Sequence, residues 1–245
     1  MSLNHQARKR FGQNFLVDQQ IIAQIISAVA PKPEQNLVEI GPGMAAITEH
    51  LVERCPSMKV VELDRDLVNF LTEKFAAYPD FSIFSGDALK TDFAQFHKGR
   101  QMRLVGNLPY NISTPLLFHL LEARTMIRDM HFMLQLEVVD RLTATHSTSD
   151  YGRLSIMSQI YCDSQNMFSE PPEAFTPRPK VMSAIVKLRP HHNSAENVNM
   201  ERLQTLLTKT FSMRRKTIRN ALKGFITAQG LEEIGLDPML RPENL

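Results

Sequence analysis

The order of apolar and polar residues along the chain predicts a repeated alternation of strands and helices. Short, nearly uninterrupted apolar runs are typical of buried parallel strands, whereas apolar residues spaced three and four apart are typical of helices. Apolar runs predict strands at 37–40, 59–63, 81–87, 102–107, 130–135 and 181–188. Helical spacing predicts helices after the N-cap candidate Asp18, up to about Arg54, at 65–76 and at 115–123. This alternation indicates an α/β fold with a doubly wound parallel sheet.

The pattern changes towards the C-terminus. After Met167 the segment SEPPEAFTPRPKV carries four prolines, which favours an extended loop over a helix. Beyond Pro190 a polar stretch, HHNSAENVN, separates the strand series from helical patterns that continue to about Gly235. We therefore expect residues 1–190 to form the main domain with an N-terminal arm, and residues 191–245 to form a small helical domain.

Composition narrows the classes of protein that fit. The 245 residues are 43% hydrophobic, enough for a sizeable core, and no apolar run approaches the roughly 20 residues of a membrane span. Cys55 and Cys162 are far apart and outside any CxxC motif, which predicts structural thiols in a reducing compartment, with the cytoplasm as the default. The adjacent pair His191 and His192 lacks metal-ligand spacing, so no metal site is expected.

The formal net charge is only +2, but the basic residues are clustered. One cluster without any Asp or Glu consists of Arg202, Lys209, Arg214, Arg215, Lys216, Arg219 and Lys223. A second consists of Arg8, Lys9 and Arg10 near the start of the chain. Two such patches favour a phosphate-bearing partner such as a nucleic acid, and a solvated helix face is the competing interpretation.

A glycine loop, EIGPGMAA at 39–46, follows the first predicted strand of the sheet. In open α/β sheets ligands bind at the carboxyl ends of the strands, where glycines let the backbone approach them. Ala46 occupies the third glycine position of the G-x-G-x-x-G pattern, which tolerates alanine, so a dinucleotide ligand stays open. A plain helix-entry turn is the alternative.

Two carboxylates follow at the ends of the next predicted strands. Glu62, in VVELDRD, has the position from which a carboxylate accepts hydrogen bonds from ribose hydroxyls. Asp64 and Asp66 are better interpreted as helix-start residues. Asp87, in SGDAL, could reach the amine of an adenine in the same ligand, or could cap a helix.

The stretch GNLPYNIST at 106–114 is placed where the reactive group of such a ligand would lie. The Asn107 amide oxygen and the Leu108 carbonyl could each accept one hydrogen from an exocyclic adenine amine, a poor nucleophile that needs help. Pro109 would fix the turn and hold the preceding carbonyl, and the Tyr110 ring offers a face for a base taken out of its helix. The sequence therefore suits alkylation of an amine on a nucleobase.

Taken together, these stretches resemble the KsgA (RsmA) family of small-subunit rRNA adenine dimethyltransferases over nearly the whole chain. The stretches that carry the resemblance are RKRFGQNFL (8–16), VEIGPG (38–43), VELDRDL (61–67), GNLPYNISTPLLFHLL (106–121), DMHFMLQ (129–135), YGRLSI (151–156), AFTPRPKVMSA (174–184) and RRKTIRNAL (214–222).

The resemblance implies a Rossmann-like class I methyltransferase domain with S-adenosylmethionine as cofactor and 16S rRNA as partner. The cofactor contacts that it implies are Asn14, Leu16, Gly41, Gly43, Glu62, Asp87 and Asn107. It also implies that the target adenine lies between Tyr110 and Phe175, and that each of two adjacent adenosines receives two methyl groups. The basic clusters, here Arg8, Lys9, Arg10, Arg214, Arg215, Lys216 and Arg219, would bind the RNA.

Three other functions compete with this interpretation. One is a dimethyltransferase that acts on large-subunit rRNA, and another is a ribosome-assembly factor whose binding matters more than its catalysis. The third, a nicotinamide dehydrogenase, uses the same glycine loop and Glu62 but leaves NLPY and Phe175 without a function. Nothing in the sequence requires more than a monomer. Ala45, two positions after the second glycine of the loop, departs from a fully glycine-rich loop.

Overall fold

The computed structural model describes residues 13–191 and 198–245; the basic residues Arg8, Lys9 and Arg10 lie outside them. The chain divides into two compact units, one comprising Met1–Val139 and Asp163–His192, the other Asp140–Cys162 and Asn193–Leu245. The second unit thus combines the C-terminal segment with residues 140–162, which precede the boundary expected near residue 190. Each unit is described by itself below.

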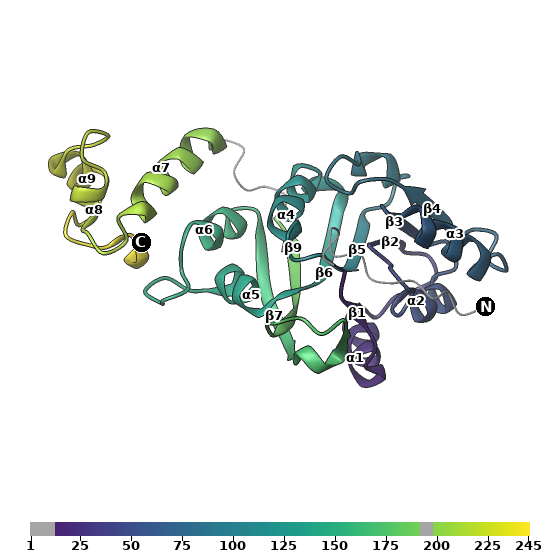
Figure 1. The fold of residues 1–245 in the computed structure, drawn as a ribbon. Coiled ribbons are helices and arrows are strands. Elements are labelled where there is room, and N and C mark those ends of the chain that lie inside the picture. The colour runs from purple at the N-terminus through teal and green to yellow at the C-terminus, as the bar shows by residue number, and fades with distance from the viewer. Residues whose placement is uncertain (1–12, 192–197) are drawn as a thin grey trace. The chain divides into compact units, whose positions relative to one another are not determined.

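The first unit is built on a seven-stranded sheet with the order β4-β3-β2-β5-β6-β9-β7 (Figure 1). The strands are β2 (Asn36–Ile40), β3 (Lys59–Glu62), β4 (Ser82–Ser85), β5 (Met102–Asn107), β6 (Ile127–Gln135), β7 (Cys162–Glu170) and β9 (Ser183–Pro190). The five strands from β4 to β6 in this order are parallel, and β9 runs antiparallel to β6. The chain order reverses between β2 and β5, which is the type of position where open α/β sheets bind ligands.

Helices cover both faces of this sheet, as the doubly wound prediction requires. They are α1 (Gln19–Val29), α2 (Thr48–Arg54), α3 (Arg65–Lys74), α4 (Ser113–Glu122) and α5 (Leu136–Thr143), which continues into the second unit. Figure 1 shows α4 on one side of the strands and α1 and α2 on the other. Short 3₁₀ turns, η2 (Phe93–Phe96), η3 (Arg124–Met126) and η4 (Pro172–Ala174), lie in the connections.

Local chemistry explains where α1 and α3 begin. The Asp18 carboxylate accepts hydrogen bonds from the backbone N–H groups of Gln20 and Ile21, which confirms it as an N-cap. The Asp64 carboxylate caps α3 by accepting from Asp66 N at 3.0 Å. The Asp64 cap starts α3 directly after β3, at the carboxyl edge of the sheet.

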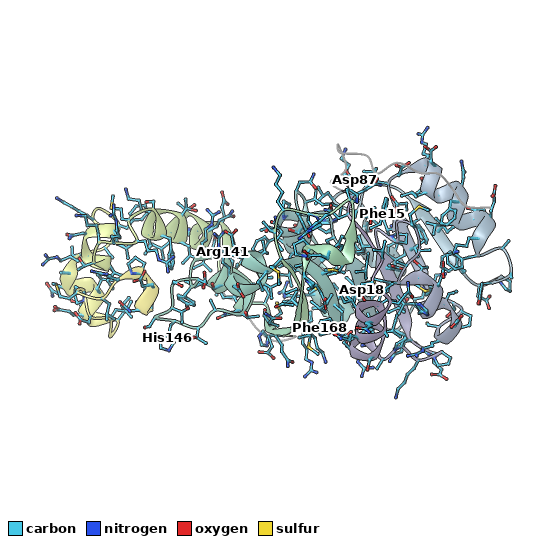
Figure 2. All side chains as sticks on the ribbon, turned by 60° about the horizontal axis from the view of Figure 1, so that its bottom comes forward. Phe15, Asp18, Asp87, Arg141, His146 and Phe168 are labelled. Carbon is cyan, nitrogen blue, oxygen red and sulfur yellow. The ribbon has the colours of Figure 1, made fainter. Side chains whose placement is uncertain are left out.

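A large apolar cluster fills the space between the sheet and α1, α2 and α3. Ile22, Ile25 and Val29 of α1 pack in it with Leu37 and Val105 from the strands. Asp18 and Phe168, labelled in Figure 2, lie at the start of α1 and on β7, and Phe168 packs against this cluster. Fully burying one such aliphatic side chain stabilises a fold by roughly 1.5–3 kcal/mol, so α1 is held mainly by packing.

A second, two-stranded sheet pairs β1 (Phe15–Leu16) with β8 (Phe175–Thr176) in antiparallel register. Leu16 lies opposite Phe175, and Val17 N donates to Ala174 O at 2.9 Å. The N-terminal arm is therefore fastened to the proline-rich loop, two segments that are far apart in the sequence.

The second unit is helical. It contains α6 (Arg153–Gln159), α7 (Met200–Ser212), α8 (Ile218–Ala221), α9 (Ala228–Glu233) and the 3₁₀ turn η5 (Pro242–Asn244). Its small core consists of Ile218, Leu222 and Leu231 with partly buried leucines and Ile226 around them. Arg141 and His146, labelled in Figure 2, belong to the segment 140–162 of this unit. In the described residues no helix has the length and apolar character needed to cross a membrane.

Candidate active site

A cavity of about 250 Å³ opens at the carboxyl ends of β2, β3 and β5. Phe15 and Asp87, both labelled in Figure 2, line it from the arm and from the segment after β4. The cavity brings together the residues expected to hold a cofactor and those of the NLPY stretch: Asn14, Leu16, Gly41, Gly43, Glu62, Asp87, Asn107, Leu108, Pro109 and Tyr110. Residues from five separate segments of the chain thus share one hollow.

The glycine loop turns sharply beneath this cavity. Gly41 and Gly43 have φ angles of 68° and 57°, in the left-handed region that favours glycine. A Cβ on Gly43 would lie 3.1 Å from the Phe15 ring, so the bare backbone is what lets the arm close over the loop. Ala45 adopts φ 69° and its N–H donates to Pro42 O, so a left-handed position is held here without glycine.

Glu62 is the carboxylate expected for ribose hydroxyls, and the structure fixes its orientation. Its Oε1 accepts from Asp64 N at 2.9 Å and its Oε2 accepts from Gly43 N at 3.3 Å. Burial raises the pKa of this carboxyl, while these backbone N–H groups act in the opposite direction. Each oxygen has a second lone pair that can accept a ligand hydroxyl.

The position of Asp87 is compatible with both interpretations that the sequence left open, and its contact with an adenine amine remains a prediction. Its Oδ1 accepts from Leu89 N at 3.0 Å and so caps a turn. Its side chain also lines the cavity, and the second carboxylate oxygen can accept from an amine.

Asn107, the last residue of β5, is held by the arm. Its Nδ2 donates to the backbone carbonyl of Asn14 at 2.8 Å. A carbonyl oxygen can only accept, so this bond fixes which end of the amide is nitrogen. The Oδ1 atom accepts no hydrogen bond from the residues that the structure describes, which leaves an acceptor on a cavity-lining side chain.

The rest of NLPY forms the turn expected from its proline. Leu108 N donates to Met133 O at 3.2 Å, and Ile112 N donates to Pro109 O at 3.1 Å. Tyr110 is half-buried, and its hydroxyl lies 2.6 Å from Ser183 Oγ at the start of β9. Its ring is therefore held by two segments, the turn and the sheet.

Phe175 does not line the cavity. Its side chain is only 3% exposed and belongs to the apolar cluster under α1, because the pairing of β1 with β8 turns it inward opposite Leu16. A stacking function for Phe175 remains a prediction, and in this arrangement the ring would have to leave the core to meet a base.

Three residues of the site were not identified from the sequence. A Cβ on Gly106 would lie 2.4 Å from Ile40 O, so glycine is required where β5 passes β2. Phe15 covers Gly43, as described above. Glu39 lines the cavity at 1% exposure, and burial, with the Glu62 carboxylate nearby, raises its pKa to about 8. A charged residue inside an apolar strand was the available signal for Glu39.

The C-terminal basic residues differ in what they contact. Arg214 forms an ion pair with Glu243, with 2.7 Å between Nε and Oε2, and its Nη2 donates to Thr148 O. Arg215, Lys216 and Arg219 are exposed, and no ion pair joins them to other described residues. Within the described part of the chain, Cys55 and Cys162 form no disulfide, and no group of histidines, cysteines and carboxylates is suited to hold a metal ion.

The sheet order, the glycine loop and the buried carboxylate at the end of β3 define a class I S-adenosylmethionine-dependent methyltransferase, and the solved structures agree. A dimethyladenosine transferase from Plasmodium falciparum has a TM-score of 0.82 and 26% identity, covering 94% of this chain and 92% of that one. The 23S rRNA methyltransferase ErmE has a TM-score of 0.73 and 26% identity, covering 94% and 96%.

The sequence comparisons identify the family. The model of the ribosomal RNA adenine dimethylases matches residues 4–237. Ribosomal RNA small subunit methyltransferase A of Hahella chejuensis is 52% identical over all of this chain and 90% of that protein. The protein of the same name from Saccharophagus degradans is 54% identical over 98% of this chain and 91% of its own length. The chain belongs to the ribosomal RNA adenine dimethylase family.

Proposed function

We propose that the protein transfers methyl groups from S-adenosylmethionine to the exocyclic amines of two adjacent adenosines near the 3′ end of 16S rRNA, two groups to each. The relatives that are half identical over nearly the whole chain carry a small-subunit methyltransferase name. The observation that carries the proposal is the orientation of Asn107, because its amide oxygen remains an acceptor beside the cofactor residues.

The cavity residues fit the cofactor. Glu62 would accept the ribose hydroxyls, Asp87 the adenine amine, and the glycine loop would let the amino acid part approach the backbone. S-adenosylmethionine supplies a methyl group that is already activated by its positively charged sulfur. The protein therefore has mainly to align the amine and exclude water.

Asn107 Oδ1 and the Leu108 carbonyl would accept the two hydrogens of the adenine amine and draw its lone pair out of the ring. Tyr110 would hold the base by its face. After the first transfer one hydrogen is left, so only one of the two acceptors is used. The second transfer then depends more strongly on how the ring is held.

For RNA binding, we expect Arg215, Lys216 and Arg219 to contact phosphates, and Arg214 to stabilise its own unit through Glu243. Reversing the charges of Arg215 and Lys216 should weaken binding and reduce the slope of log affinity against log salt by about 0.7–0.9 per lost phosphate contact. The Arg214→Ala variant should instead lower the melting temperature. An unchanged salt slope in the double variant would make this patch a solvated helix face.

The substrate is tested by incubating the protein with labelled S-adenosylmethionine and, in parallel, unmethylated small subunits, large subunits and duplex DNA. Label should appear in small-subunit RNA, as N6,N6-dimethyladenosine at two adjacent positions. Label that appears first or only in large-subunit RNA would support the activity for which ErmE is named. Small-subunit binding without transfer would favour an assembly factor.

We also expect the protein to work as a monomer in the cytoplasm. Its two buried cysteines, which form no disulfide, are compatible with a reducing compartment, where ribosomal subunits mature. Sedimentation of the purified protein tests the first expectation, and fractionation of cells tests the second.

A further inference from the structure

We propose that Ser183 is a positioning residue for methyl transfer, which acts by holding the hydroxyl of Tyr110. The inference rests on the proposed function, because it concerns how the target base is held. Ser183 Oγ and Tyr110 Oη are 2.6 Å apart, although the two residues are 73 positions apart in the chain.

Ser183 lies in a buried strand, whereas Tyr110 lies in a half-buried turn. Ser183 is the first residue of β9, lies opposite Gln135 of β6 and is completely buried. The preceding residue is fixed as well, since Met182 O accepts from Leu136 N at 2.9 Å. Tyr110, in contrast, stands in the turn between β5 and α4 and is only half-buried.

Two hydrogen bonds fix the tyrosine at opposite ends. At its backbone, the Tyr110 carbonyl accepts from Ser113 Oγ at 3.2 Å. At the far end of its ring, the hydroxyl meets Ser183. Rotation about the Cα–Cβ bond of Tyr110 would carry the hydroxyl away from Ser183, so this bond selects one position of the ring.

That position matters because the ring would receive the base. A base that tilts with a loose ring no longer presents its amine in line with the methyl donor, and small misplacements of this kind reduce rates strongly. The second transfer should suffer more than the first, since the monomethylated amine has lost one of its two hydrogen bonds. Burial raises the pKa of the Tyr110 hydroxyl, so it stays neutral and can donate.

The experiment compares Ser183→Ala, Tyr110→Phe and the double variant in single-turnover transfer to unmethylated small subunits, with nucleosides quantified by mass spectrometry. Each single variant should slow transfer about tenfold, the size expected for one neutral hydrogen bond, and raise the share of N6-monomethyladenosine. The double variant should be no slower than either single one. Cofactor affinity and KM for the subunit should change little.

Ser158→Ala is the matched control, because Ser158 is also completely buried and, among the described residues, its hydroxyl bonds only to Ser155 O within its own helix. It should leave the rate and the product ratio unchanged. Ser183→Thr, which keeps the hydroxyl, should restore transfer if the alanine variant folds poorly.

An unaltered rate in Ser183→Ala, or a slowing of the same size in the Tyr110→Phe background, would overturn the positioning of Tyr110 by Ser183. Absence of transfer by the unaltered protein would overturn the proposed function and this inference together. The two failures are therefore distinguishable in one assay.

Discussion

Two asparagines mark opposite ends of the same sheet, and they are used differently. Asn36 opens β2, where its Nδ2 donates to Phe96 O and Arg100 O and its Oδ1 accepts from Lys59 Nζ. Asn107 closes β5, where its Nδ2 makes one bond to the arm and its Oδ1 accepts none from the described residues. The first amide is saturated by its own protein, whereas the second keeps an acceptor for a ligand.

The hollows beside Asn36 and Asn107 differ as well. The hollow at the amino end is lined by charged and polar side chains such as Lys59, Lys98 and Asp80 and is open to solvent. The cavity at the carboxyl end holds Glu39 and Glu62, both buried, beneath an arm that covers the glycine loop. The unused hydrogen-bond acceptor thus lies at the carboxyl end, where open sheets of this type bind ligands.

The sharpest way to break this comparison is to replace both asparagines. Asn107→Ala should lower transfer by at least about 10²-fold, as loss of a preorganised catalytic hydrogen-bonding group does, with RNA binding nearly intact. Asn36→Ala should leave transfer per folded molecule unchanged and cost about 1–2 kcal/mol of unfolding free energy. Rates and chemical denaturation measure the two effects. Loss of RNA binding in Asn107→Ala would make that residue structural.

The buried carboxyl of Glu39 should make stability depend on pH. Burial raises its pKa from 4.5 to about 8, so the folded protein keeps a proton that the unfolded chain releases. The free energy of unfolding should therefore fall between about pH 4.5 and pH 8, by up to about 1.4 kcal/mol per pH unit. Denaturation series should show a flatter dependence in Glu39→Gln.

Lys59→Gln is the control variant for this pH dependence, at the amino end of the sheet. Burial, and then the charge of Lys98, lower the pKa of Lys59 from its ordinary value of 10.5, which lies well above this range. The slope between pH 5 and pH 7 should stay as in the unaltered protein. Parallel curves for Glu39→Gln and the unaltered protein would show that Glu39 ionises normally.

The smallest expected difference between the two ends of the sheet concerns Gly106 and Gly99. Gly106→Ala places a Cβ against Ile40 O and should cost about 1–3 kcal/mol of stability while raising KM for the cofactor, because β2 and β5 must separate. At Gly99, near the amino end, a Cβ meets nothing within 4 Å, although φ is +76°. Gly99→Ala should cost about 1 kcal/mol, from backbone strain, and leave KM unchanged. Equal KM values in both variants would contradict the expected role of the close strand contact.

Much of the first unit could be predicted because its signals are local. The apolar runs gave β2 to β6 and β9 within a few residues, and Asp18 and Asp64 start helices as expected. β7, in contrast, was not predicted. Its sequence, CDSQNMFSE, is mostly polar because an edge strand exposes many of its side chains, and only its neighbour in the sheet defines it.

Site residues could be predicted from the sequence where a motif lies at the end of one strand. Contacts between two distant segments could not. Glu62 and Asn107 belong to the first kind. The bond between Asn107 and Asn14 O spans 93 positions, and no pattern in either segment announces it. Phe175, which the resemblance places beside the target adenine, is buried by its pairing with the arm, and its sequence neighbourhood does not announce that pairing.

The antiparallel direction of β9 determines which segment of this protein could be replaced in a redesign. Because β9 runs against β6, its first residue, and not its last, lies beside the end of β6, and the segment 171–182 is held at both ends, by Glu170 of β7 and Ser183 of β9. The segment 171–182 is thus a connection whose two ends are held by strands β7 and β9. A redesign for another base could replace it, provided that Ala174–Thr176 still pair with the arm.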